Sequence, residues 1–385
     1  MVLLKYLRRH LCPSSSLMSK VKAIGIYIHV PFCLGKCPYC DFYSVYPKEE
    51  TVKEYLEAIK RSIREYSLIY KRDVKTVYFG GGTPNLIGAE GICGILETLK
   101  KEFNILKEAE ITVECNPNSV TEEFFSLVKS SGVNRISMGL QSANEDELKF
   151  LGRKHSVLNV ISAVSFAKKA GIDNISLDLM IGLENQTKEK LKNSIDFCAS
   201  LNVSHVSSYI LKVEENTPFA KRNFQLPDED ESAELYLFAC EELEKKGYKQ
   251  YEISNYSKEN KESRHNLIYW HGEEYLGIGP GAHSFMENKR FYYDRDLNSF
   301  INGIGTNDDG EGGDFEEYLM LNLRLSEGLN KNKCIEKFES GENLFNEALN
   351  KAKKIPSNYI NISEENISLT REGFLISNSI ISMLI

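Results

Sequence analysis

The sequence of 385 residues has no apolar run of the 18 or more residues that a membrane-spanning helix needs. A basic excess is also missing, because 47 Lys and Arg side chains stand against 55 Asp and Glu, giving a formal net charge of −8. Phosphate backbones are bound by basic surfaces, so this balance argues against nucleic acid as a partner. Peripheral contact with a membrane stays open. The composition predicts a protein without a transmembrane segment, long enough for two or three packed units.

A disulfide framework is lacking as well. The nine cysteines are an odd number, no secretory signal pattern precedes them, and three of them fall within eight residues. Such grouping indicates a reducing compartment and metal ligation, so we expect a cytoplasmic protein. The other six cysteines are scattered and are expected to be small buried hydrophobes: Cys12, Cys93, Cys115, Cys198, Cys240 and Cys334.

Acidic residues are absent from the first 22 positions, which are basic and include three consecutive serines. This composition suits a mitochondrial presequence over residues 1–17, and the location would then be mitochondrial. The alternative is a start codon assigned too early, with translation beginning at Met18. Residues 1–22 are therefore treated as a basic N-terminal extension, either not translated or cleaved, and stay outside the fold argument.

From residue 24 onward, stretches typical of strands alternate with stretches typical of helices. The expected strands are 24–30, 74–79, 111–114, 135–140, 175–180 and 203–209. The expected helices between them are 49–70, 89–103, 121–130, 156–170 and 187–201. Connections long enough for a helix favour parallel pairing. The predicted fold class is α/β, with a partial parallel (β/α)6 barrel over residues 23–225.

The alternation stops near residue 226. Residues 226–301 are expected to form an α+β extension that begins with a helix over 228–246, and the glycine-rich residues 302–314 are expected to be a linker. Residues 315–385 are expected to form a small C-terminal helical domain resembling a winged helix. Its expected elements are helices over 315–325 and 331–353, two short strands near 358–361 and 366–369, and a last helix from residue 370.

The strongest motif is the run from Cys33 through Cys37 to Cys40, with the spacing C-x3-C-x2-C. A chain with this cysteine content would contain that spacing by chance only about 0.005 times. Thiolates favour soft metals and hold iron–sulfur clusters. Three cysteines leave one iron of a [4Fe–4S] cluster open to an exogenous chelate, such as the amino and carboxylate groups of S-adenosylmethionine (SAM). The alternative is a zinc site with His29 or a distant cysteine as fourth ligand.

Polar or glycine-rich residues mark the end of each expected strand. The cysteine loop follows the first strand and Gly80-Gly-Gly-Thr-Pro84 follows the second. The remaining four strands end at Glu114, Gln141, Asp178 and Tyr209. Ligands bind at the carboxyl ends of parallel strands, so these residues are expected along one edge.

Several longer motifs accompany the cysteine loop. They begin at Tyr27 (YIHVPFC), Gly80 (GGGTP), Glu114 (ECNP), Arg135 (RISMGLQ), Leu151 (LGRKH) and Asp178 (DLMIGL). In this order they resemble the coproporphyrinogen III dehydrogenase-like (HemN-like) radical SAM family, over about residues 24–384. The resemblance implies a radical SAM barrel that binds a [4Fe–4S] cluster and SAM.

The resemblance also implies site residues. The cluster ligands would be Cys33, Cys37 and Cys40. The SAM contacts would be Tyr27, Tyr39, Gly81, Gly82, Thr83, Glu114, Gln141, Arg153 and Asp178. The Arg153 guanidinium suits the methionine carboxylate, while the side chains of Glu114, Gln141 and Asp178 suit ribose hydroxyls or the amino group.

Two departures separate the chain from the dehydrogenase itself. The dehydrogenase loop continues Cys-x-Cys, whereas Phe42 stands at that position here. In addition, residues 265–270 resemble the HNxxYW motif of HemW-type heme chaperones. The resemblance implies heme binding, with His265 as a candidate axial ligand and Tyr269 and Trp270 against the porphyrin face. The alternative for this motif is a buried structural element that joins the barrel to its extension.

Two functions follow from the resemblance. The first is a heme chaperone that binds heme, the cluster and SAM and delivers heme to apo-haemoproteins. The second is an oxygen-independent coproporphyrinogen III dehydrogenase, which carries out radical SAM oxidative decarboxylation in porphyrin biosynthesis; Phe42 is the feature against it. A radical SAM enzyme with another substrate also stays open, because a fold does not fix a substrate. The sequence leaves open whether the chain is an enzyme and whether it forms a homodimer.

Overall fold

The computed structural model describes residues 22–385. The predictions for residues 1–17, and for nearly all of the basic extension, therefore lie outside the described residues. Within residues 22–385, no helix combines the length and the apolar character that crossing a membrane requires.

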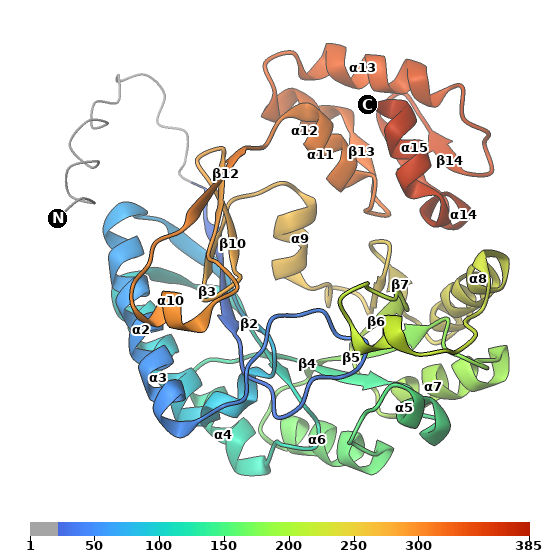
Figure 1. Ribbon diagram of the computed structural model, residues 1–385. Helices are drawn as coiled ribbons and strands as arrows, with labels where there is room; N and C mark the ends of the chain where they lie inside the picture. The colour runs from blue at the N-terminus through green and yellow to red at the C-terminus, as the bar shows by residue number, and fades with distance from the viewer. Residues whose placement is uncertain (1–21) are drawn as a thin grey trace, which may run out of the picture.

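Six parallel strands, side by side in chain order, form the centre of a twelve-stranded sheet (Figure 1). They are β1 (Ile24–Val30), β2 (Asp73–Gly81), β3 (Asn104–Cys115), β4 (Arg135–Gln141), β5 (Asn174–Ile181) and β6 (His205–Ile210). The longer helices between them are α2 (Glu49–Ile69), α3 (Gly88–Glu102), α4 (Glu122–Ser130), α6 (Val157–Lys169) and α7 (Lys188–Ser200). The predicted α/β class with six parallel units is confirmed. Because β1 also pairs with β9 and β6 with β8, the sheet does not close on itself.

The two faces of the central strands differ in polarity. On β1, Ile24, Ile26 and Ile28 are fully buried in the main core, where helix α2 contributes Tyr55 and Ile59. Burial of each such side chain contributes roughly 1.5–3 kcal/mol. The alternate residues of each strand face the other way, because successive strand side chains point to opposite faces. That inner face is largely polar, and it forms the floor of the site.

The extension after β6 adds strands at both ends of the parallel sheet. Its elements are α8 (Glu229–Lys245), β7 (Lys249–Gln250), β8 (Asn255–Ser257), α9 (Arg264–Trp270), β9 (Tyr275–Ile278), β10 (His283–Met286), β11 (Lys289–Tyr292), α10 (Leu297–Ile301) and β12 (Asn307–Glu311). The expectation of a linker over 302–314 is wrong for the residues of β12, which pair antiparallel with β11. Pairing with β11 outweighs the low strand propensity of a segment rich in Gly, Asp and Asn.

The C-terminal part contains helices and a three-stranded antiparallel sheet. Its elements are α11 (Phe315–Asn322), β13 (Leu329–Asn330), α12 (Lys331–Lys337), α13 (Gly341–Ala352), β14 (Ile360–Ile362), β15 (Asn366–Leu369), α14 (Arg371–Leu375) and α15 (Ser377–Leu384). The single helix predicted over 331–353 is wrong, because the chain turns between α12 and α13. Gly341 lies so close to Cys334 that a Cβ would be 2.1 Å from its carbonyl oxygen. Figure 1 shows α9 between the sheet and these C-terminal elements.

Candidate functional site

A cavity of about 420 Å³ lies at the carboxyl ends of the parallel strands. Its lining includes all three cysteines of the motif and eight of the nine expected SAM contacts. Those eight are Tyr39, Gly81, Gly82, Thr83, Glu114, Gln141, Arg153 and Asp178. The ninth, Tyr27, is not among the lining residues; its hydroxyl lies 3.1 Å from Nδ1 of His29. Residues far apart in the sequence therefore meet at one edge, as the strand pattern predicts.

The cysteine loop is closed at its base by backbone hydrogen bonds. The amide of Cys33 donates to the carbonyl of Val45 at 3.0 Å, and the amide of Val45 donates to the carbonyl of Pro31 at 2.7 Å. Within the loop, the Cys40 amide donates to the Cys37 carbonyl at 3.0 Å. All three cysteines of the motif are half-buried. In residues 22–385, no three His, Cys, Asp or Glu side chains converge closely enough to hold a single metal ion.

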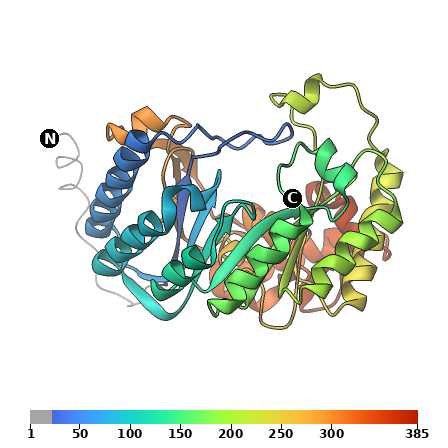
Figure 2. The same ribbon diagram turned by 90° about the horizontal axis from the view of Figure 1, so that it is seen from below.

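A small apolar cluster packs against the cysteine loop at Pro38 and Tyr39. Phe219, which is fully buried, packs its ring 6.0 Å from that of Tyr39, and its amide donates to the carbonyl of Pro38 at 3.0 Å. Phe150 and Phe224 complete the packing around Phe219. Figure 2 shows the segment after β1, in blue, and the segment after β6, in yellow-green, on the same side of the sheet. The loop is thus held by the sheet at its base and by aromatic packing at its tip.

The glycines at the carboxyl end of β2 allow a close approach between this part of the chain and the end of β1. Gly81 has a φ of 110°, and a Cβ there would lie 2.7 Å from the His29 ring. A Cβ at Gly82 would lie 2.5 Å from the carbonyl oxygen of Phe32. Only glycine fits such positions. The glycines therefore let the GGGTP turn lie directly against the start of the cysteine loop.

Two half-buried carboxyl groups face the cavity, Glu114 from β3 and Asp178 from β5. Burial raises the pKa of Glu114 to about 7, although its Oε1 accepts a hydrogen bond of 2.7 Å from the Tyr78 hydroxyl. Burial also raises the pKa of Asp178, whose Oδ1 accepts a hydrogen bond from Ser137. Asp178 does not end its strand, as the sequence suggested, but lies three residues before the end of β5. Both groups can accept hydrogen bonds from a ligand in the cavity.

Arg153 brings a positive charge to the cysteine loop. Its Nη1 lies 3.5 Å from the Sγ of Cys37, and its Nη2 donates to the Gly139 carbonyl at 3.1 Å. Its Nε lies 3.3 Å from Nδ1 of His155, whose Nε2 lies 3.0 Å from the carbonyl of Leu140. These contacts orient the guanidinium toward the cavity.

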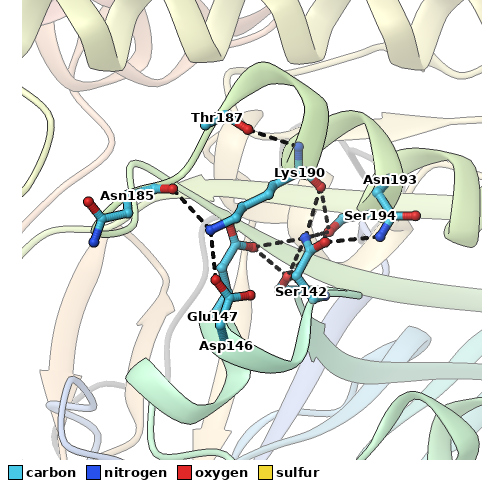
Figure 3. A network of polar contacts seen from close by, with 9 residues as sticks. Ser142, Asp146, Glu147, Asn185, Thr187, Lys190, Asn193 and Ser194 are labelled. Carbon is cyan, nitrogen blue, oxygen red and sulfur yellow. Dashed lines mark hydrogen bonds and ion pairs between the residues drawn. The ribbon is translucent and has the colours of Figure 1, made fainter.

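Gln141 holds an unusual backbone conformation at the end of β4, with a φ of 68°. The next residue, Ser142, is fully buried and donates to Glu147 of α5 (Glu145–Phe150). Figure 3 shows that Ser194 of α7 lies beside this pair, and its Oγ accepts from the Ala143 amide at 2.9 Å. Around them, Lys190 pairs with Asp146 at 2.7 Å. These hydrogen bonds and this ion pair hold the turn after Gln141 against α7.

This network and part of the cavity lining were not predicted from the sequence. Helix α5 was not expected, because its six residues are too few for a clear helical period. Ser137 and Gly139 also line the cavity. Both could have been predicted, because they alternate with Gln141 on β4 and every second residue of a strand points to the same face.

The HNxxYW motif forms α9, which lies away from the cavity and near the amino end of β2. His265 is 1% exposed. Its Nδ1 lies 2.7 Å from the hydroxyl of Thr76, and its Nε2 lies 2.8 Å from the hydroxyl of Tyr269. Tyr269 and Trp270 are half-buried. In this conformation both ring nitrogens of His265 are hydrogen-bonded, so heme iron could bind one of them only if its contact with Thr76 or Tyr269 is broken.

Comparison with known proteins identifies the family. The Radical SAM superfamily matches residues 27–198. The heme chaperone HemW of Bacillus subtilis is 34% identical over 92% of this chain and 97% of its own length, and that of Haemophilus influenzae is 34% identical over 96% and 99%. The solved structure of coproporphyrinogen III oxidase (HemN) from Escherichia coli, described as a radical SAM enzyme, has the same fold, with a TM-score of 0.80, 19% identity and coverage of 94% of this chain and 90% of that one. Radical SAM proteins use a [4Fe–4S] cluster and SAM, and at this identity over nearly its full length the chain belongs to the HemW family within that superfamily.

Proposed function

We propose that the chain is a heme chaperone that holds a [4Fe–4S] cluster through Cys33, Cys37 and Cys40 and binds SAM in the adjoining cavity. The observation that carries the cluster and SAM part is the meeting of three half-buried thiols with the expected SAM contacts around one cavity. The names of the HemW relatives support the heme part.

The donor set around the cavity fits a [4Fe–4S] cluster. Three thiols on one short loop supply the soft ligands that iron–sulfur clusters take, and a cluster gives each thiolate its own iron atom. The thiols therefore need not converge on a single ion. Burial raises the pKa of Cys40, and the charge of a bound cluster would offset that penalty, because a coordinating thiol is deprotonated by its metal. The fourth iron would be left to a ligand from outside the chain.

The remaining lining residues fit SAM. Arg153 presents a guanidinium beside Cys37 and would pair with the carboxylate of SAM. Glu114 and Asp178 offer acceptors for an ammonium group or ribose hydroxyls. A reduced cluster and SAM, when bound together, supply one-electron chemistry. The chain's own part is to bind and orient the ligand and to limit water around it.

Heme binding is the less direct part of the proposal. His265 is neutral, because burial and the charge of Arg135 lower its pKa to about 3. A neutral imidazole has the lone pair that heme iron takes. For His265 to bind iron, however, the ring must give up the hydrogen bond to Thr76 or the one to Tyr269, and α9 must open. We propose that heme is taken up in such an opened state and delivered to apo-haemoproteins in the cytoplasm.

Reconstitution with iron and sulfide under anaerobic conditions tests the cluster. We expect the parent chain to gain the absorbance and iron content of a [4Fe–4S] cluster, and the variant with Cys33, Cys37 and Cys40 all changed to Ala to gain neither. Cys93→Ala is the matched control, because Cys93 is also half-buried but lies outside the cavity. Cluster formation without the three thiols would refute the assignment.

The second candidate function, coproporphyrinogen dehydrogenation, is favoured by the shared fold with HemN. At the mouth of the cavity, Phe42 is 66% exposed and supplies no thiol where the dehydrogenase loop has its last cysteine. Heme titration and anaerobic turnover of coproporphyrinogen on the same reconstituted preparation separate the two. Heme binding without decarboxylated product supports the chaperone, whereas product formation would replace it.

A further inference from the structure

An aromatic stack runs from helix α9 to the floor of the cavity. The ring of Tyr78 lies 5.1 Å from that of His265 at an interplanar angle of 26°, and Tyr27 stacks on both rings. At its other end, Tyr78 donates its hydroxyl to Oε1 of Glu114 at 2.7 Å. The HNxxYW motif and a lining carboxyl of the cavity are therefore two contacts apart.

The residues around His265 fix the position of its ring. Thr76 and Tyr269 each bond one ring nitrogen, at 2.7 and 2.8 Å. The neighbouring position on β1 is Gly25, where a Cβ would lie 2.7 Å from Ile268 and 3.2 Å from the imidazole. Glu110 accepts hydrogen bonds from the amides of Arg264 and His265, at 3.2 and 3.0 Å, and so anchors the start of α9 to β3. These contacts leave the imidazole one orientation, in which its face lies against the ring of Tyr78.

The pair formed by Tyr78 and Glu114 is equally confined. At Gly80, a Cβ would lie 2.9 Å from the Tyr78 ring and 3.2 Å from Oε1 of Glu114. The two side chains are half-buried, and the 2.7 Å hydrogen bond between them fixes the Glu114 carboxyl at the edge of the cavity. If the imidazole leaves the other face of Tyr78, the phenol is freed to turn and Glu114 loses its fixed donor.

We infer that His265 is a positioning residue of the SAM cavity, and that capture of its imidazole by heme iron and binding of SAM oppose each other. A neutral imidazole has one accepting nitrogen, and that nitrogen is bonded here to a hydroxyl whichever tautomer is present. Iron must take that lone pair, so it must break the contact with Thr76 or with Tyr269. The opposition between heme and SAM rests on the heme part of the proposed function, whereas the positioning role of His265 rests only on its SAM part.

The chain offers a matched control for the positioning role. His205 is also 1% exposed, and its ring nitrogens are also bonded to two hydroxyls, those of Ser176 at 2.7 Å and Tyr251 at 2.8 Å. No stacking joins His205 to Tyr78 among the contacts of residues 22–385. A change at His205 therefore removes the same kind of buried ring without touching the stack.

The first experiment measures SAM binding to the reconstituted holoprotein, by calorimetry and by the change that SAM causes in the electron paramagnetic resonance of the reduced cluster. We expect His265→Gln and Thr76→Val to weaken SAM binding by about tenfold at unchanged cluster content, and His205→Gln to change it by less than about twofold. Thr76→Val keeps the ring and the fold if His265→Gln does not. Unchanged SAM affinity in both, or an equal loss in His205→Gln, would overturn the positioning role.

The second experiment titrates hemin into the parent holoprotein with and without saturating SAM, and SAM with and without hemin. Coupling between two sites is reciprocal, so each ligand should weaken the other by the same factor, about fivefold or more. Independent binding would overturn the opposition. If hemin does not bind at all, the proposed function fails, whereas the SAM affinities of the first experiment still decide the role of His265.

Discussion

Arg153 reaches Cys37 across 116 residues of sequence, with its Nη1 3.5 Å from the sulfur and its Nη2 held by the carbonyl of Gly139. The guanidinium thus stands beside the metal loop and is oriented by backbone. Charge-assisted hydrogen bonds of this kind contribute about 1.5–3 kcal/mol. Arg153→Gln should therefore weaken SAM binding at least tenfold while the cluster still assembles, as calorimetry and iron content would show. Lys149→Gln, an exposed change on the preceding helix, should leave SAM affinity unchanged.

Glu114 predicts a pH dependence of SAM binding. Its pKa of about 7 means that the carboxyl accepts hydrogen bonds fully only above neutrality. If SAM needs the ionised form, its affinity should rise about tenfold between pH 6 and pH 8. Asp178 and Arg135 face the same group and influence the midpoint. Anaerobic titrations at constant ionic strength check this, and Glu114→Gln should flatten the profile; the same slope in that variant would assign it to another group.

Phe219 should control how long the cluster survives. It is fully buried among Tyr39, Phe150 and Phe224. Removing a buried Phe ring costs about 3–5 kcal/mol, and here the lost packing is what holds the tip of the cysteine loop. Phe219→Ala should speed the loss of cluster absorbance in the presence of a chelator, and Phe219→Leu should do so less. Equal decay rates in all three proteins would show that the loop is held by its base alone.

We expect Gln141 to lower the stability of the fold and to strengthen SAM binding. Its left-handed backbone conformation costs a residue with a Cβ about 1–2 kcal/mol. Gln141→Gly should relieve most of that cost and raise the thermal midpoint, but it should weaken SAM binding because the side-chain amide is lost. Asn202→Gly is the control, since Asn202 also has a positive φ and lies outside the cavity lining. A Gln141→Gly protein with unchanged SAM affinity would remove this side chain from the site.

His265 should make the fold sensitive to acid. Its pKa is about 3 in the folded chain and about 6.5 when unfolded, so the unfolded chain binds more protons between these values. The stability tied to the neutral ring is present above pH 6.5 and is lost as pH falls, by roughly 2 kcal/mol at pH 5. Between pH 7 and pH 5 the parent should therefore lose about 2 kcal/mol more free energy of unfolding than His265→Gln. Urea titrations at the two pH values measure this, and parallel losses would contradict it.

Much of the fold and of the cavity could be predicted because both depend on strand order and strand ends. The first strand was expected over residues 24–30 and is found as Ile24–Val30. Parallel strands that follow one another in a sheet bring their carboxyl ends together, so Cys33, Glu114 and Gln141 had to meet once the pairing was right. The network around Ser142 and Glu147 could not be predicted, because it depends on how α5 packs against α7.

The position of α9 was harder to predict for a different reason. The HNxxYW motif indicates that its residues act together. It does not indicate that the His265 ring is buried beside Gly25 and hydrogen-bonded to Thr76. These two residues belong to β1 and β2, more than 180 residues earlier in the chain. A motif describes residue types along one segment, whereas the availability of a ring nitrogen depends on everything that packs around it.

A sheet that does not close exposes two edge strands, and strand edges are templates for the addition of other chains. At one edge β7 is only two residues long, and at the other β12 exposes Asp308, Asp309 and Glu311. A second chain trying to extend the sheet along β12 would have to bring its backbone against these carboxylates. The glycine-rich segment that was expected to be a linker thus places a row of negative charges along this open edge, which disfavours the pairing of a further strand.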